Sequence, residues 1–123
     1  MKFAKYVFTI AGIWGILILT PLYFIFDKIG ERDPPAVTHP LFYYGFAGVA
    51  LAWQFLFLVI GSNPVKFRPL MLVGILEKLG YFLPAVALYL QHKVHPIDLL
   101  GGCLDMTLGV FFLLAYWKTP EQA

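Results

Sequence analysis

Residues 70–90 of the chain read LMLVGILEKLGYFLPAVALYL. The run is almost entirely apolar, and its length matches the roughly 20 residues that a helix needs to cross a bilayer. It nevertheless contains adjacent charged residues, Glu77 and Lys78, near its middle, and Pro84 interrupts its second half. These residues predict a transmembrane helix with ionisable groups inside the membrane and a break in its backbone hydrogen bonding.

Three further apolar runs have a similar length, so four membrane spans are predicted. They cover about residues 7–26, 41–61, 70–90 and 97–117. The connections are short, which makes consecutive helices antiparallel neighbours. We therefore expect an all-α protein with a single integral membrane domain over residues 1–123, built as an antiparallel four-helix transmembrane bundle. The first connection carries five charges and the pair Pro34–Pro35, which favours extended chain there.

The composition excludes several other classes of protein. Hydrophobic residues make up 60% of the chain, charged residues make up 13%, and the mean hydropathy is +0.77. A soluble domain has about 25% charged residues, and one this small could not bury so much apolar surface. A net charge of +2 offers no basic field for nucleic acid, so no nucleic-acid partner is expected.

The cysteine and histidine content gives no sign of a metal or cofactor. One cysteine excludes an intramolecular disulfide, and no cluster has zinc-ligand spacing. His92, His95 and Asp98 follow one another at intervals of three, but Pro96 interrupts any helical face that they could share. We therefore expect these histidines to bind nothing, and we expect neither a metal site nor a cofactor.

The basic residues that flank the spans predict the orientation. Five lie on one side of the predicted membrane and three on the other. The first group is Lys2, Lys5, Lys66, Arg68 and Lys118, and the second is Lys28, Arg32 and Lys93. Because Lys and Arg concentrate on the cytoplasmic side, both termini are expected in the cytoplasm.

Four charged residues lie within the predicted spans: Glu77, Lys78, Asp98 and Asp105. A charge at the middle of a bilayer costs roughly 2.5–3.5 kcal/mol, so such residues usually face the protein interior and find a partner. Asp98 begins its span and is expected to reach the interface. Lys78 and Asp105 are offset by about 6 Å along the bundle, at about 1.5 Å rise per residue, and can meet only if their helices adjoin in a favourable register. Glu77 points about 100° away from Lys78, toward the first or second helix if Lys78 faces the fourth.

Small residues and a proline predict how these helices pack. Gly101, Gly102 and Gly109 lie on or beside the stripe formed by the two aspartates, where they would let a neighbouring helix approach closely. Pro84 leaves the carbonyl of the residue four positions earlier without its helical donor. We expect the third helix to bend there and to open space beside Glu77.

The candidate site is the set of polar residues that these considerations place inside the bundle. Two interpretations remain open: an ion-pair network that fixes helix register, or a buried polar pocket that binds a ligand, relays a proton or performs acid–base chemistry. No catalytic motif accompanies the set, so no residue is assigned a catalytic role. The candidate residues are Glu77, Lys78, Asp105, Gln54, Tyr81 and Asp98.

Several short strings are similar to a known group of proteins: Tyr44-Gly45-Phe46, Phe67-Arg68-Pro69-Leu70-Met71, Glu77-Lys78-Leu79, and Asp105 with Gly109-Val110. On these strings the chain resembles small bacterial four-helix membrane proteins that are loosely DoxX-like. The resemblance implies a bacterial inner-membrane location and a compact four-helix bundle. It implies no catalytic residues.

The sequence favours a multi-pass membrane protein that is non-enzymatic or an accessory subunit, with a structural polar network. One alternative is a membrane-embedded binding protein, or an isomerase-like enzyme, for a small lipid-like ligand. Another is a small transporter that acts as a dimer. The expected partners are the lipid bilayer and either a second copy of the chain or a partner membrane subunit.

Overall fold

Four long helices account for most of the structure, a computed structural model that describes residues 2–32 and 37–120. In this part of the chain every regular element is helical. The elements are α1 (Lys2–Leu19), η1 (Thr20–Phe24), α2 (Phe26–Arg32), α3 (Pro40–Ser62), α4 (Arg68–Leu90) and α5 (Pro96–Lys118). Four helical segments are long and apolar enough to cross a membrane: Lys2–Phe24, α3, α4 and α5. The prediction of an all-α chain with four candidate spans is therefore confirmed.

The first span differs most from its predicted bounds. It was expected over residues 7–26, whereas the helical segment covers Lys2–Phe24 and changes at Thr20 from an α-helix to a 3₁₀-helix. Hydropathy marks where a helix is apolar but not where it begins, and no residue before Val7 opposes helix formation. Pro21 lies in the first turn of the 3₁₀ segment, where its missing N–H removes no α-helical hydrogen bond.

The first connection also contains a helix that its charges and prolines did not predict. Helix α2 spans Phe26–Arg32, with Asp27 in its first turn and Arg32 in its last. This arrangement of charges stabilises a helix, because each charge opposes the helix dipole at its own end. Pro34 and Pro35 lie outside the described residues.

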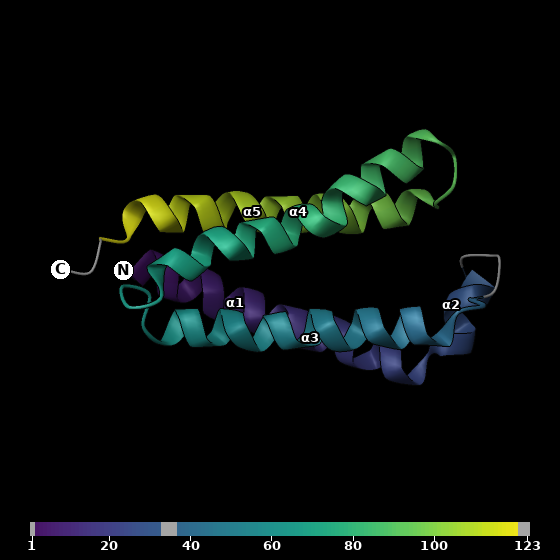
Figure 1. Cartoon of the computed structure of the whole chain (residues 1–123), viewed down its shortest axis with the longest axis horizontal. Coiled ribbons are helices and arrows are strands. Elements are labelled where there is room, and N and C mark those ends of the chain that lie inside the picture. The colour runs from purple at the N-terminus through teal and green to yellow at the C-terminus, as the bar shows by residue number, and fades with distance from the viewer. Residues whose placement is uncertain (1, 33–36, 121–123) are drawn as a thin grey trace.

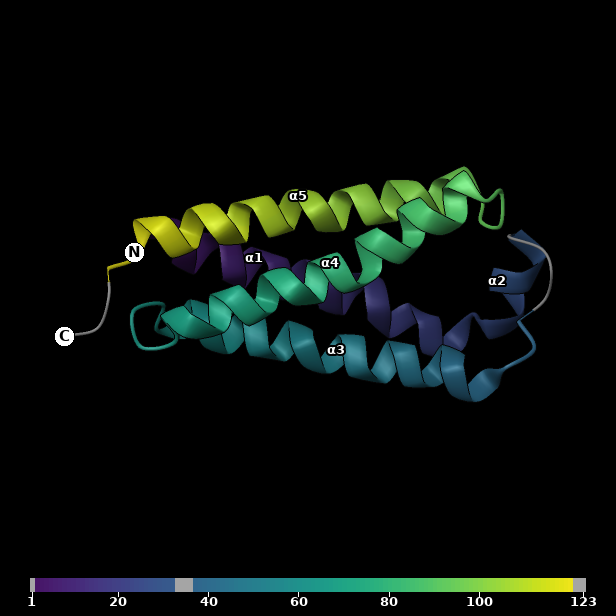
Figure 2. The same ribbon diagram turned by 45° about the horizontal axis from the view of Figure 1, so that its top comes forward.

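The long helices associate as two pairs. Helix α1 packs along α3, and α4 packs along α5, whereas contacts between the two pairs are fewer and come mainly from α1 against α5. Figures 1 and 2 both show the pairs lying together at the end that holds the termini and separating toward the other end. The resemblance implied a compact bundle, but the structure is tightly packed at one end only.

Close packing of α1 on α3 depends on glycines of α1. A Cβ atom at Gly12 would lie 2.8 Å from the backbone oxygen of Gln54, and one at Gly15 would overlap the side chain of the same glutamine. Small residues thus allow the two backbones to approach, as they do in membrane helix pairs generally.

Glycines of α5 have the same role against α4. A Cβ atom at Gly102 would lie 3.0 Å from that of Ala85, and one at Gly109 would lie 3.4 Å from the Cβ of Lys78. The predicted close approach is therefore observed at Gly102 and Gly109, whereas a Cβ atom at Gly101 would meet only the hydroxyl of Tyr81, at 3.6 Å.

An aromatic core holds the two pairs together at the end with the termini. The rings of Phe8 and Phe112 stack with centroids 4.2 Å apart, and Phe57 meets Phe112 edge-on at 4.9 Å. All three side chains are fully buried, and they come from α1, α5 and α3.

Arg68 adds a polar connection within the second pair. Its Nε donates to the carbonyls of Tyr116 and Thr119 and so joins the start of α4 to the end of α5.

Beyond this core, α4 bends away from α3. The bend is visible in Figure 1 in the second half of the helix, which contains Pro84. Proline cannot donate the helical hydrogen bond and pushes against the preceding turn, so a bend at this place follows from the sequence.

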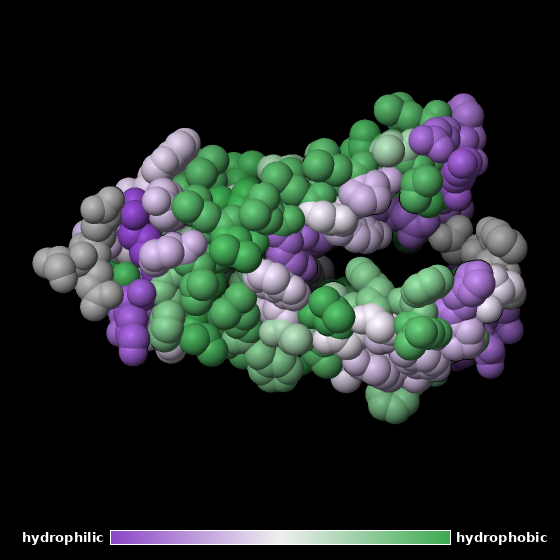
Figure 3. All heavy atoms as spheres, viewed as in Figure 1, coloured by the Kyte–Doolittle hydropathy of each residue, from purple (hydrophilic) through white to green (hydrophobic). Residues whose placement is uncertain are grey.

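The outer surface is strongly apolar. Figure 3 shows hydrophobic residues over the middle of the molecule and hydrophilic residues at its two ends. Exposed large side chains occur on all four long helices, among them Leu17, Phe55, Leu76 and Leu104. Such a surface suits contact with lipid acyl chains.

The close packing of α1 on α3 can be tested by substituting a glycine between these two helices, Gly12, and a glycine of α3 that has open space beside it, Gly45. Gly12→Ala is expected to lower the free energy of unfolding by about 1–3 kcal/mol, because the new methyl group meets backbone. Gly45→Ala is expected to be neutral or to stabilise by up to about 1 kcal/mol, because no atom lies within 4 Å of the new Cβ. Unfolding in mixed micelles, followed by circular dichroism, measures both. Equal losses would contradict the packing.

Candidate functional site

A cleft separates the two helix pairs where they diverge. It consists of two adjoining cavities of about 660 and 370 Å³, which we call the outer and the inner cavity. The residues that line both cavities are Phe46, Ala50, Glu77, Tyr81 and Asp98. Figure 3 shows the hollow between the pairs, with hydrophilic surface at its inner end.

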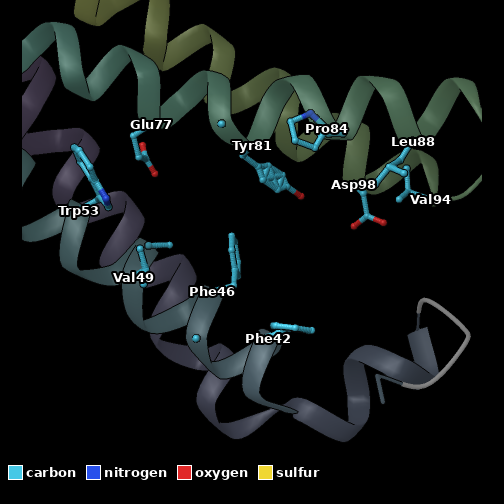
Figure 4. A pocket seen from close by; sticks show the side chains of 14 residues that line it. Phe42, Phe46, Val49, Trp53, Glu77, Tyr81, Pro84, Leu88, Val94 and Asp98 are labelled. Carbon is cyan, nitrogen blue, oxygen red and sulfur yellow. The ribbon is translucent and has the colours of Figure 1, made fainter. Parts of the chain in front are cut away.

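The outer cavity has mainly apolar walls. In Figure 4 the side chains of α3 face those of α4 across the open space, with Asp98 of α5 on the α4 side. The α3 residues Phe42, Phe46, Val49 and Trp53 form one wall because intervals of three and four residues bring side chains to the same face of a helix. An apolar molecule could therefore be accommodated between the pairs.

The inner cavity is more polar. Its lining includes residues from α1, α3, α4 and α5, and all six residues of the predicted polar set lie there. They are Gln54, Glu77, Lys78, Tyr81, Asp98 and Asp105. Asp98 lies in the first turn of α5, along the cleft wall, and its location at the membrane interface stays a prediction.

Lys78 lies at the centre of the charged group. Its Nζ is 3.5 Å from Oδ1 of Asp105 and 3.5 Å from Oε2 of Glu77. The two partners lie on different helices and in different directions, so the long lysine side chain bridges the angle between them. The predicted proximity of Lys78 to Asp105 is therefore observed, and the amino group also reaches its sequence neighbour.

Aromatic rings shield the lysine on its other side. Its Nζ lies 5.1 Å from the ring centre of Phe57 and 6.0 Å from that of Phe112, and only 4% of its side chain is exposed. A cation above an aromatic face is stabilised by the ring quadrupole, and more so when it is desolvated. The aromatic core thus forms the floor of the cleft, directly below the charged group.

The position of Lys78 depends on Gly109. The Cβ of Lys78 lies close to the site that a side chain at position 109 would occupy. A larger residue there would push α4 away from α5 and carry the lysine away from Asp105. The sequence therefore sets this ion pair through a glycine one turn beyond the aspartate.

Gln54 leaves one polar atom without a partner. Its side chain is 2% exposed and its Nε2 donates to the carbonyl of Ala50, at 2.9 Å. Its Oε1 is buried and accepts no hydrogen bond, and it lies against Gly15, another residue of the inner cavity. A buried acceptor left unpaired costs about 1–3 kcal/mol, which makes this atom unusual in a folded protein.

Glu77 also has a buried side-chain oxygen that accepts no hydrogen bond. Its Oε2 is also buried and has no hydrogen-bond partner, although the lysine charge lies at 3.5 Å. Figure 4 shows the carboxyl group directed into the space between α4 and α3. The inner cavity therefore presents two buried oxygen acceptors that lack donors.

Sequence reasoning missed the aromatic wall of α3. Phe42, Phe46 and Trp53 line the outer cavity but are not among the candidate residues predicted from the sequence. The regular spacing of Phe42, Phe46 and Trp53 was a usable signal, because it identifies one helical face.

The histidines are not part of this site. Among the described residues no three His, Cys, Asp or Glu side chains are grouped as metal ligands. His95 instead caps α5, because its Nδ1 accepts the backbone N–H of Ile97. It is therefore a local structural residue at the start of the helix.

Comparisons with protein-family models, with curated proteins and with solved structures find no match to this chain. Functional inference therefore depends on the geometry of the cleft.

Replacing Lys78 tests how much its ion pairs with Glu77 and Asp105 contribute to stability. Lys78→Met is expected to destabilise the protein by about 3 kcal/mol, because two carboxyl groups lose their shared cation. Adding Glu77→Gln and Asp105→Asn to this variant should recover most of that loss. The control is Lys66→Met in the exposed α3–α4 connection, with an expected change within about 0.5 kcal/mol. Unfolding in mixed micelles measures the stability of the single Lys78 variant, the triple variant and the Lys66 control. Equal stability of Lys78→Met and Lys66→Met would refute the shared ion pair.

Proposed function

We propose that the chain is a multi-pass membrane protein that binds a small amphipathic, lipid-like molecule in the cleft between its helix pairs. One observation carries this proposal: apolar walls lead to an inner end with charged groups and two buried oxygens without hydrogen-bond donors. The apolar part of the ligand would occupy the outer cavity, and its polar head would lie near Glu77 and Asp105.

The dimensions and lining of the cleft support binding. Ligand pockets in proteins commonly measure about 300–1,000 Å³ and combine apolar walls with a few polar groups. The outer cavity, at about 660 Å³, lies within this range, and its lining combines apolar side chains with Glu77, Tyr81 and Asp98. Ionisable residues inside a membrane span are expensive to insert and usually mark a functional pathway or site.

A purely structural network explains less of what is seen. An ion-pair group that only fixes helix register should satisfy its own polar atoms, since each unpaired buried atom reduces stability. Lys78 donates a hydrogen bond to Asp105, but Gln54 Oε1 and Glu77 Oε2 accept no hydrogen bond. A bound polar head would supply them, so we favour the binding function over the accessory role.

The distribution of basic residues supports an orientation in the membrane. The termini and the α3–α4 connection lie at the closed end of the molecule, where the larger group of lysines and arginines is found. We place this end in the cytoplasm, with the helices crossing in alternating directions. The cleft then opens toward the opposite face. The short strings described above further suggest a DoxX-like protein of a bacterial inner membrane.

Blocking the outer cavity tests the proposed function. Gly45→Leu adds a side chain where no atom lies within 4 Å of the new Cβ, so it should narrow the cavity and obstruct the ligand without disturbing the fold. Ala52→Leu is the matched control, because Ala52 is exposed on the same helix and lines neither cavity. Membranes are extracted into native nanodiscs, and bound small molecules are identified by mass spectrometry.

The wild type and Ala52→Leu should retain the same amphipathic molecule at a fixed ratio to protein. Gly45→Leu should retain about tenfold less of it, which corresponds to a loss of about 1.4 kcal/mol in binding free energy. The proposed function would be wrong if the wild type held no such molecule, or if folded Gly45→Leu retained as much as the control.

A further inference from the structure

The inner cavity has an excess of hydrogen-bond acceptors. Glu77, Asp98 and Asp105 each contribute a carboxyl group, and Gln54 contributes its amide oxygen. Ionised carboxylates only accept hydrogen bonds, and two of the oxygens here, on Gln54 and Glu77, have no donor. A head group that fits this cavity must therefore donate hydrogen bonds.

Lys78, the cationic side chain in the cavity lining, makes no hydrogen bond to Gln54 Oε1. Its Nζ bonds Oδ1 of Asp105 and lies 3.5 Å from Oε2 of Glu77, and its remaining space is bounded by Phe57 and Phe112. Gln54 Oε1 is thus left for a donor that comes from outside the protein, and Glu77 shares its cation with Asp105.

Charge balance favours a donor that is also a cation. Glu77 and Asp105 share the single amino group of Lys78, so ionisation of all three groups would leave one negative charge in excess. Unbalanced charge in a low-dielectric interior is costly, whereas a bound cation would offset it. A carboxylate or phosphate head would increase the imbalance.

The aromatic residues above the inner cavity suit the same head group. Phe46 of α3 and Tyr81 of α4 face each other across the cleft with ring centroids 6.1 Å apart, and both line the two cavities. Aromatic faces attract cations, and their apolar surfaces accommodate the first carbons of an attached chain.

Building on the proposed binding function, we infer that the ligand is an amphiphile whose head is a protonated primary or secondary amine. Its N–H groups donate to Gln54 Oε1 and the Glu77 carboxylate, and its apolar part extends past Phe46 into the outer cavity. A quaternary ammonium has the charge but no N–H, a hydroxyl group has a donor but no charge, and a carboxylate has the wrong charge.

Four probes with the same twelve-carbon chain separate the effect of a positive charge from that of a hydrogen-bond donor. They are dodecylamine, dodecyltrimethylammonium, 1-dodecanol and dodecanoic acid. Each is titrated against the wild-type protein in phosphatidylcholine nanodiscs at pH 7, where an alkylamine with a pKa near that of lysine, about 10.4, is protonated. Binding is measured by native mass spectrometry. The amount bound to nanodiscs with Gly45→Leu is subtracted, because it reports partition into lipid.

Dodecylamine is expected to bind at least about tenfold more tightly than each of the other three probes. Equal or tighter binding of any one of them would overturn the amine inference and leave the proposed binding function intact. If no probe binds above the Gly45→Leu background, the amine inference fails. The function itself is then decided by the separate search for a retained molecule.

A pair of variants locates the head group. Glu77→Gln should weaken dodecylamine binding about tenfold and leave dodecanol binding unchanged, because a neutral amide replaces the carboxylate that the amine contacts. Glu31→Gln is the matched control, because Glu31 is exposed on α2 and lines neither cavity. Unchanged amine affinity in folded Glu77→Gln would overturn the inference; if that variant does not fold, the ranking of probes on the wild type decides.

Discussion

The amino group of Lys78, held between Glu77 and Asp105 inside the apolar part of the chain, is the interaction on which the rest of the structure depends. A lone cation at this depth would be expensive, so α4 and α5 must lie close enough for Asp105 to reach it. The rings of Phe57 and Phe112 below it close one end of the molecule. The open cleft begins directly above the charged group.

The cleft follows from where the chain allows close packing. Glycines join α1 to α3 and α4 to α5, whereas no comparable seam joins α3 to α4. The aromatic core fixes the two pairs at one end, and Pro84 carries the second half of α4 away from α3. The same separation that exposes Glu77 to the cleft leaves Oε2 of its carboxyl group charge-paired with Lys78 but without a hydrogen bond, which links the fold to the proposed ligand.

Much of the fold was predictable from the sequence, because spans of apolar residues and the need to neutralise Lys78 are local or nearly local constraints. The meeting faces of α4 and α5 were predicted in part from Lys78, Asp105 and the glycines of α5, but those of α1 and α3 were not. Gly12 and Gly45 look alike in sequence, yet one lies in a tight seam and the other lines a cavity. Helix α2 was missed because its charges are typical of a connection. Space beside Glu77 was predicted from Pro84, but the extent of the cleft was not, because it depends on the relative placement of whole helix pairs.

The most direct measurement is the distance between Lys78 and Asp105 in a lipid bilayer. Solid-state NMR on protein with ¹⁵Nζ-labelled lysine and ¹³Cγ-labelled aspartate reports the dipolar coupling between them, and Lys78→Met and Asp105→Asn assign the signal. A strong coupling is expected, consistent with the 3.5 Å separation of Nζ and Oδ1. Its absence in the folded wild type would show that Lys78 is neutralised elsewhere and would contradict this arrangement of helices and cleft.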